Sequence, residues 1–370
     1  MTVESSTLQA SATTAEWNDW RWQLQHRLRS TEDLEQHFTL TTSERSALER
    51  LGGKLPMAVT PYYASLCEDD PDDPLRRTII PVEDEFVVTE GEREDPLGED
   101  AHSPVPGIVH TYPDKVLFLV TDFCAVYCRY CTRARVVGSG EIPPARSMWK
   151  TALNYIRETP EVRDVLISGG DPLTLSDERL DWLLAELRTI PHVEIIRIGT
   201  KIPFVMPQRI TPELTAILKQ YHPLWFSLHT THPRELTAES ETACARLADA
   251  GIPLMSQSVL LKGINDSLEC QRELLHGLLR FRVKPYYLHQ CDAIAGSEHF
   301  RTTIESGRDI IRGLHGYTTG YAVPTYMVDA PGGGGKVPLT PDYVDGQDGA
   351  NWQLKNYKGE QYSYREGQGS

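Results

Sequence analysis

The sequence predicts an α/β protein built around a partial (β/α)6 barrel that is open on one side. From Lys115 onward, short apolar segments alternate with amphipathic ones, which is the pattern of a parallel sheet with right-handed crossovers. Six such strand–helix units follow one another. Chemically distinctive residues stand at the ends of several of these strands, where barrels of this kind carry their active sites.

Each strand is expected where a short apolar run occurs: Val116–Val120, Asp164–Ser168, Glu194–Ile198, Leu224–Leu228, Leu254–Val259 and Val283–Leu288. Helices are expected between them, at Met148–Glu158, Asp177–Arg188, Pro212–Gln220, Glu241–Ala250 and Leu268–Arg280. Ser176 and Thr211 are good helix N-caps, and Gly251 suits a C-cap. These signals agree with the apolar pattern, so they support the same set of elements.

The segments on either side of the barrel look different. Residues 16–100 are expected to form a helical N-terminal region, with one helix over Trp17–Leu28 and another that begins at the capping box Thr41-Thr42-Ser43-Glu44. Residues 1–15 are rich in Ser and Thr and lack the features of a secretory signal, so we expect a disordered tail. We assign residues 101–320 to the barrel and 321–370 to a C-terminal segment.

Composition excludes several classes of function. The 370-residue chain carries a net charge of −15, which argues against a nucleic-acid-binding surface. No apolar run is long enough to span a bilayer, so no membrane association is expected. We interpret the acidic clusters Glu68–Asp73 and Glu83–Asp100 as solvated flanks. The seven cysteines do not resemble a disulfide framework, which favours a reducing cytoplasm.

Three cysteines, Cys124, Cys128 and Cys131, stand at a C-x3-C-x2-C spacing just after the first expected strand. Cysteine thiolates are the usual protein ligands of iron–sulfur clusters. A cubane cluster has four irons, so three thiolates leave one iron open to a small molecule. The alternatives are three core cysteines on one helical face and a structural zinc site, which would need a fourth ligand. A ferredoxin would also need a fourth cysteine nearby.

A second motif lies near the C-terminus, where the four glycines Gly332–Gly335 precede Lys336. A phosphate-binding P-loop is excluded, because Ala330 and Val337 occupy places that its pattern reserves for Gly and Ser or Thr. A lysine on a flexible glycine arm suits Schiff-base chemistry with an aldehyde cofactor. A surface loop with a solvated lysine is the alternative.

Together these segments resemble the lysine 2,3-aminomutase family, whose members are radical S-adenosylmethionine (SAM) enzymes that also use pyridoxal 5′-phosphate (PLP). The resemblance covers nearly the whole chain and is carried by Glu16–Gln23, Ser103–Gly107, Cys124–Arg133, Ser168–Asp171, Pro285–Tyr287, Gln290–Asp292 and Val328–Lys336. The joint occurrence of the cysteine triplet and the glycine-rich arm is its most specific part.

The resemblance implies a radical SAM barrel and an isomerase that moves an α-amino group to the β-carbon. It implies that a [4Fe–4S] cluster is held by Cys124, Cys128 and Cys131, and that PLP is held by Lys336. SAM would be seated by Ser168, Gly169, Gly170, Asp171, His229 and Gln257. Arg133 would pair with the substrate carboxylate, and a distal cationic group would be received by Asp292 and Asp329.

The acidic pair predicts a basic amino acid as substrate, with lysine preferred and arginine as the alternative. The resemblance also implies an external electron donor such as flavodoxin or ferredoxin, and a homo-oligomer. Two other classes of protein stay open: a non-catalytic iron–sulfur electron carrier, and an ordinary PLP enzyme with structural zinc. The Lys336 arm argues against the first, and the missing fourth ligand argues against the second.

Four residues depart from the family pattern. Tyr130 stands in the cysteine loop where histidine is frequent, and His289 stands where tyrosine is common. Thr111 and Lys115 occupy places often held by arginine, where contacts to the PLP phosphate are expected. These departures concern the contacts expected to the PLP phosphate and, at His289, the end of the substrate pocket near Asp292.

Overall fold

The computed structural model describes residues 7–10, 12–52 and 55–367, and its centre is a nine-stranded sheet with strand order β1 to β9. All six expected strands are present: β2 Lys115–Thr121, β3 Asp164–Gly169, β4 Ile195–Thr200, β5 Leu224–His229, β6 Leu254–Leu260 and β7 Val283–Gln290. They pair in chain order and run parallel to one another. The predicted partial barrel is therefore confirmed.

Three strands of this sheet were not expected. β8 (Thr325–Ala330) adds a seventh parallel strand beside β7, whereas β1 (Ile108–Tyr112) and β9 (Gly335–Pro338) lie antiparallel at the two edges. β1 and β9 are hairpin partners of their neighbours, and a hairpin needs no crossover helix. Strand–helix alternation in the sequence therefore does not reveal β1 and β9.

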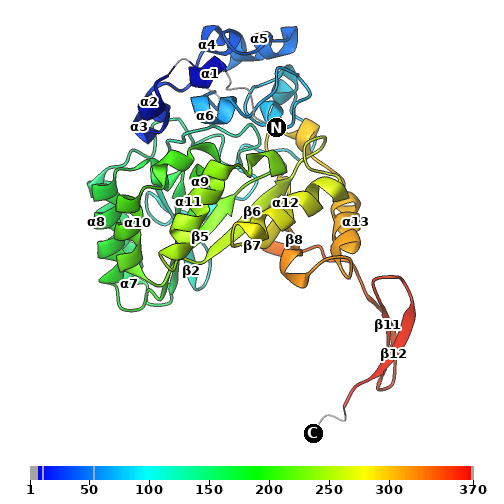
Figure 1. Ribbon diagram of the computed structural model, residues 1–370. Coiled ribbons are helices and arrows are strands. Elements are labelled where there is room, and N and C mark those ends of the chain that lie inside the picture. Colours follow the sequence, from blue (N-terminus) through cyan, green and yellow to red (C-terminus); the bar gives the residue numbers. More distant parts are fainter. Residues whose placement is uncertain (1–6, 11, 53–54, 368–370) are drawn as a thin grey trace.

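Helices cover the outer face of the sheet (Figure 1). They are α7 Arg146–Glu158, α8 Asp177–Arg188, α10 Pro212–Leu218, α11 Ala238–Asp249, α12 Leu268–Arg280 and the unexpected α13 Ile304–Leu314. The short helix α9 Ile202–Val205, also unexpected, follows directly after β4. Thr211 caps α10 by accepting a hydrogen bond from the Leu214 N–H, and Gly251 follows α11 with a positive φ of 79°. Ser176 occupies the N-cap of α8, although its side chain makes no capping bond.

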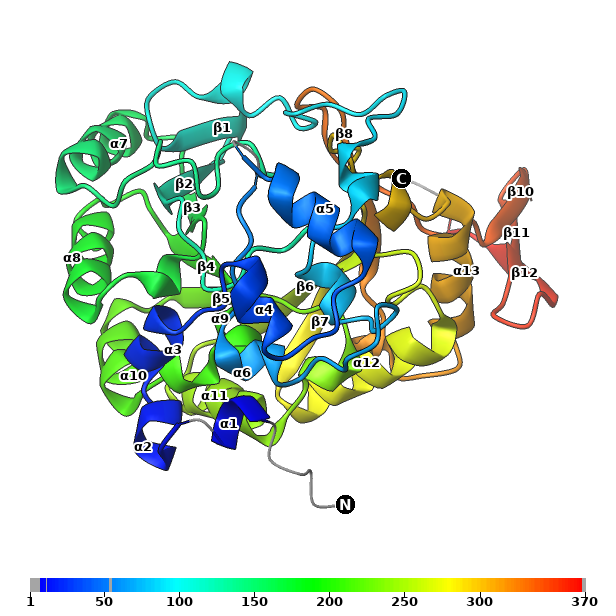
Figure 2. The same cartoon turned by 90° about the horizontal axis from the view of Figure 1, so that it is seen from above.

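The N-terminal region packs on the barrel instead of forming a separate core. Its helices are α1 Thr7–Ala10, α2 Thr14–Trp17, α3 Trp20–Gln25, α4 Thr31–Glu35, α5 Thr42–Arg50 and α6 Pro61–Ala64. Figure 2 shows α3 to α6 lying over the strands when the barrel is viewed from above. Leu34, Tyr63 and Leu75 are fully buried in the same hydrophobic cluster as Phe118 and Ile167 of the barrel. These helices therefore cover one end of the sheet.

Two expectations for the N-terminal region were wrong. The helix expected over Trp17–Leu28 is interrupted, because Asp19 accepts a hydrogen bond from the Arg21 N–H and so caps a new helix, α3. Part of the expected disordered tail is ordered: Thr7–Ala10 is helical, and Leu8 is buried in the core. Residues 1–6 and 11 lie outside the described residues. The capping box at Thr41 is confirmed as the start of α5.

The end of the chain forms a second, smaller sheet of β10 (Val344–Asp348), β11 (Asn351–Lys355) and β12 (Gln361–Arg365). This sheet stands apart from the barrel (Figure 1). The sequence here showed no usable pattern, because the strands are polar and largely exposed. Over the described residues, we find no helix with the length and apolar character that a bilayer crossing requires.

Candidate active site

All the residues that the sequence analysis assigned to a site line one cavity of about 320 Å³ at the carboxyl ends of the strands. They are Cys124, Cys128, Cys131, Arg133, Ser168, Gly169, Gly170, Asp171, His229, Gln257, Asp292, Asp329 and Lys336. The topology brings them together, because the carboxyl ends of parallel strands meet at one edge of the sheet.

The three cysteines lie in the loop that follows β2. This loop contains no helix, so the three do not share a helical face, and all three are free thiols. Burial raises the pKa of Cys124 well above its usual value, with help from the Asp171 charge and the other two cysteines. Burial and the neighbouring Cys128 raise the pKa of Cys131 to about 11. Crowded, buried thiolates of this kind need a cationic partner, which an iron cluster supplies.

The donor set fits a cubane cluster. Among the described residues, no three His, Cys, Asp or Glu side chains converge on a single metal ion. A cubane does not need such convergence, because its thiolates bind different irons. The loop is held from outside by Arg27, whose Nη1 donates to the Cys124 carbonyl oxygen over 2.6 Å.

The two glycines at the end of β3, Gly169 and Gly170, allow the backbone to pass tightly against the cysteine loop. A Cβ on Gly169, whose φ is +129°, would lie 2.1 Å from the Thr121 carbonyl oxygen, and one on Gly170 would lie 2.4 Å from that of Phe123. Asp171 accepts hydrogen bonds from the Thr200 hydroxyl (2.7 Å) and the Lys201 N–H (2.8 Å). Its carboxylate therefore ties this segment to the end of β4, and the segment borders the cavity.

A buried network that the sequence analysis missed supports the cavity wall. The Tyr130 hydroxyl lies 2.8 Å from His229 Nε2, and Lys201 Nζ donates to Tyr130 (3.4 Å) and pairs with Glu235 (2.8 Å). Burial, with the Lys201 charge, lowers the pKa of His229 to about 3, so this imidazole is neutral. His229 is therefore held in place as a hydrogen-bonding group. Lys201 and Glu235 gave no sequence signal, since neither belongs to a motif.

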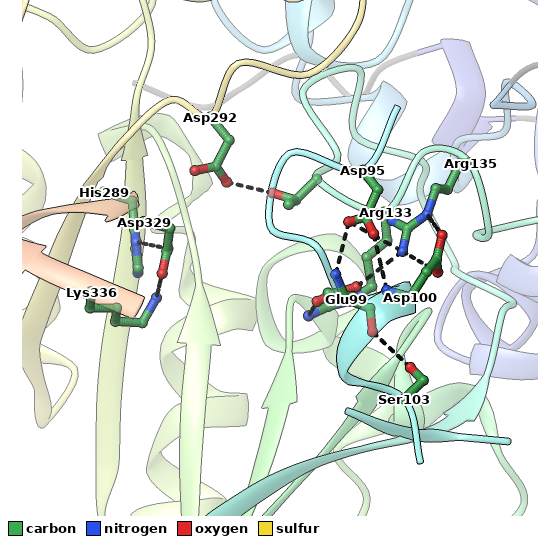
Figure 3. Close-up of polar contacts among 11 residues, drawn as sticks. Asp95, Glu99, Asp100, Ser103, Arg133, Arg135, His289, Asp292, Asp329 and Lys336 are labelled. Atoms are coloured by element: carbon green, nitrogen blue, oxygen red, sulfur yellow. Dashed lines mark hydrogen bonds and ion pairs between the residues drawn. The ribbon is translucent and has the colours of Figure 1, made fainter. Parts of the chain in front are cut away.

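Lys336 does not sit on a flexible arm, which corrects that expectation. It lies on β9 directly opposite Asp329 of β8, and the glycines between them form the turn of this hairpin. Lys336 Nζ lies 2.7 Å from Asp329 Oδ2, and its backbone N–H donates to the Tyr112 hydroxyl over 2.9 Å. His289 Nδ1 lies 3.4 Å from the same Asp329 oxygen (Figure 3).

The two aspartates of the cavity ionise differently. Burial, together with the Asp329 charge, raises the pKa of Asp292 to about 6. Among the described residues, its carboxylate accepts one hydrogen bond, from the Thr132 hydroxyl. Burial also acts against ionisation of Asp329, but His289 and Lys336 outweigh it and lower its pKa to about 2. The Asp329 charge therefore repels the Asp292 carboxylate, and Asp292 is the one that shifts toward protonation.

Arg133 has a partner that the sequence analysis did not foresee. Its Nε and Nη2 donate to the Glu99 carboxylate at 2.7–3.0 Å, and Glu99 is only 6% exposed. The interpretation of Glu83–Asp100 as a solvated flank is wrong here, since Glu85 pairs with Arg129 and Glu92 with Arg301 as well. The arginines in and after the cysteine loop were the available signal for these acidic partners.

A second cavity, of about 660 Å³, adjoins the first and shares Lys336 and Arg133 with it. Thr111, Tyr112, Lys115 and Arg197 also line this cavity. Lys115 and Arg197 bring two cations to this side of Lys336, where Lys115 pairs with Asp114 (3.7 Å) and Arg197 with Asp164 (2.8 Å).

Comparisons with known proteins agree with this geometry. Residues 118–269 match the radical SAM superfamily, and residues 311–370 match the family described as lysine-2,3-aminomutase. The chain is 51% identical to the L-lysine 2,3-aminomutase of Clostridium subterminale, over 95% of this chain and 85% of that protein. For the L-lysine 2,3-aminomutase of Bacillus subtilis the identity is 50%, over 95% and 74%.

A relative named for another substrate is also similar. The glutamate 2,3-aminomutase of Clostridioides difficile is 43% identical over 90% of this chain and 79% of its own length. Identity of about half over nearly the whole chain, together with the barrel and its cysteine loop, establishes the relationship. This chain belongs to the lysine 2,3-aminomutase family of the radical SAM superfamily.

Proposed function

We propose that this protein is an isomerase that moves the α-amino group of L-lysine to the β-carbon and forms β-lysine. The observation that carries the proposal is the charge layout of the cavity. Asp292 and Asp329 offer two carboxylates to a distal cation, and Arg133 offers a guanidinium to a carboxylate. Lysine carries both groups. Several relatives of about 50% identity are named for the same reaction.

The cofactors follow from the residues present. Cys124, Cys128 and Cys131 would hold the [4Fe–4S] cluster, and the segment 168–171 with His229 and Gln257 would contact SAM. Lys336 would bind PLP as a Schiff base, and Lys115 and Arg197 would face the PLP phosphate. When bound, the cluster and SAM supply a 5′-deoxyadenosyl radical, and PLP supplies a conjugated system that delocalises an unpaired electron.

The chain's own residues position the substrate and exclude water. Arg133 binds the α-carboxylate, and Asp292 binds the ε-ammonium, because Asp292 has no ion-pair partner among the described residues. Asp329 already holds Lys336 Nζ, so the substrate cation gains this second carboxylate only when Lys336 releases it. The N-terminal helices over the strand ends shield the radical site from solvent.

An anaerobic assay with SAM, dithionite and one amino acid at a time tests this function. We expect the highest kcat/KM with lysine, a lower value with arginine and no turnover of glutamate. Turnover of glutamate equal to that of lysine would contradict the proposal. The purified protein should also show both cluster and Schiff-base absorbance. A non-catalytic electron carrier would lack the second band, and a zinc-containing PLP enzyme would lack the first.

We also propose that an external protein reduces the cluster and that the chain forms a homo-oligomer. An external one-electron donor such as flavodoxin or ferredoxin would replace dithionite in the assay if the cluster is reduced by such a protein. Light scattering of the purified protein tests the proposed homo-oligomer, for which a monomer mass of 41.7 kDa would be the contrary result.

A further inference from the structure

The guanidinium of Arg133 has two edges that can each bind a carboxylate, and one of them is already occupied. Glu99 takes the side-on edge, with Nε 3.0 Å from both carboxylate oxygens and Nη2 2.7 Å from Oε1. Nη1 makes no hydrogen bond to the described residues, and the Arg133 side chain lines both cavities. The end-on edge, Nη1 and Nη2, is therefore the one presented to a ligand.

Glu99 is held firmly in this place. Its backbone N–H donates to Asp95 Oδ1 (3.1 Å), and its carbonyl oxygen accepts from the Ser103 hydroxyl (2.8 Å). Arg135 adds a second cation 3.8 Å from the Glu99 carboxylate and also pairs with Asp95 and Asp100 (Figure 3). These contacts hold the backbone of Glu99 in place and set two arginines beside its carboxylate.

The segment around Glu99 also touches the hairpin that carries Lys336. The Gly332 N–H donates to the Pro96 carbonyl oxygen over 3.0 Å, and a Cβ on Gly98 would lie 2.9 Å from the Gly332 carbonyl carbon. The two backbones are therefore packed without room for a side chain. This contact sets the position of Glu99, and through it that of Arg133, relative to Lys336.

We propose that Glu99 is a positioning residue for substrate recognition: it binds the side-on edge of Arg133 and so directs the end-on edge toward the substrate α-carboxylate. This inference rests on the proposed function, because it assumes an α-amino acid substrate. Guanidinium has five N–H donors in a rigid plane, so fixing one edge fixes the direction of the other. A bidentate carboxylate on that second edge is then held at a defined angle to Lys336.

The charges support the same role. Glu99 neutralises Arg133 in the absence of substrate, so the chain does not bury an unpaired cation. When the substrate carboxylate arrives, two carboxylates share Arg133, and the nearby Arg135 offsets the added negative charge. The competing idea is that Glu99 imitates the substrate carboxylate and must leave. In that case removal of Glu99 would strengthen lysine binding.

The test compares Glu99→Gln and Glu99→Ala with the wild-type holoenzyme, using lysine and lysine amide as substrates. Glu94→Gln is the matched control, because Glu94 lies in the same segment and is exposed. We expect kcat/KM for lysine to fall about 10- to 100-fold in both Glu99 variants, mainly through KM. Lysine amide lacks the carboxylate, so its kcat/KM should change little and the preference for lysine over its amide should shrink.

A general folding defect would lower kcat/KM for lysine and for lysine amide by the same factor. The preference for lysine would then be unchanged, and this result would overturn the inference. A lower KM for lysine in Glu99→Ala would also overturn it and favour the competing idea. Added formate should partly restore lysine turnover in Glu99→Ala by filling the vacated place, whereas inhibition by formate would count against the proposal. Failure of the wild type to turn over lysine would instead refute the proposed function itself.

Discussion

Asp329 lies directly across the β8–β9 hairpin from Lys336, and its carboxylate holds the lysine ammonium at 2.7 Å. One side chain thus serves both the amine proposed to bind PLP and the cavity proposed to bind the substrate cation. The hairpin makes this possible, because directly opposed residues of an antiparallel pair present their side chains on the same face. Attachment of the cofactor and recognition of the substrate are therefore linked through Asp329.

Lys336→Ala should abolish both Schiff-base absorbance and aminomutase activity. The iron content should stay unchanged, because the cysteine loop follows β2 whereas Lys336 lies on β9. Borohydride reduction of the wild type should attach PLP to a peptide that contains Lys336. Lys262→Ala, a change at an exposed lysine, serves as the control and should behave as the wild type. Label found on Lys201 or Lys262 would refute the assignment.

Replacing any one of Cys124, Cys128 or Cys131 with Ala should abolish reductive cleavage of SAM. All three thiolates are needed to bind three of the irons and leave the fourth open to SAM. Iron analysis and detection of 5′-deoxyadenosine measure the two effects separately. Cys270→Ala, on α12 and away from the cavity, should keep full iron and activity. A Cys128→Ala variant with full iron and full activity would end the radical SAM assignment.

The barrel was predictable because its signals are local. Apolar runs, N-caps and the C-cap at Gly251 lie within a few residues of the elements that they define, and the helices α8 and α12 have the expected bounds. Placement of the site residues at the strand ends then follows from topology alone. Strands such as β9 were missed because pairing with a neighbouring strand makes them extended, whereas their own composition shows no strand pattern.

The contacts inside the site were harder to predict. Glu99 meets Arg133 across 34 positions of chain, and Lys201 meets Glu235 at the same separation, so no spacing rule connects either pair. An acidic run also has the same composition whether it is solvated or paired with arginines. Burial decides between the two, and burial depends on how the N-terminal region packs on the barrel.

The pH dependence of kcat/KM for lysine should report the ionisation of the Asp292 carboxyl group. Its pKa of about 6 means that the carboxyl is ionised above pH 6 and protonated below it, and only the ionised form attracts a substrate cation. Asp329, with a pKa of about 2, stays ionised throughout this range. The ratio of wild-type kcat/KM for lysine to that of Asp292→Asn should therefore be largest above pH 7 and fall toward one near pH 5. A ratio that stays constant from pH 5 to pH 8 would contradict this assignment.

Asp292→Asn and Asp329→Asn should both lower kcat/KM for lysine, but they should differ in what else they disturb. Loss of one charged partner costs on the order of 2–4 kcal/mol, or roughly 30- to 1000-fold in kcat/KM. Asp292→Asn removes only a partner of the substrate, so PLP content should stay normal. Asp329→Asn also removes the charge of the one carboxylate that both Lys336 Nζ and His289 contact, so PLP should bind more weakly as well. Titration of each purified variant with PLP, followed by its absorbance, separates these effects.

Asp249→Asn, at an exposed carboxylate on the last residue of α11, is the control for the loss of a charge. Lysine kinetics unchanged in both variants would show that the acidic pair does not bind the substrate, whereas equal PLP affinity in the two would show that Asp329 does not support Lys336.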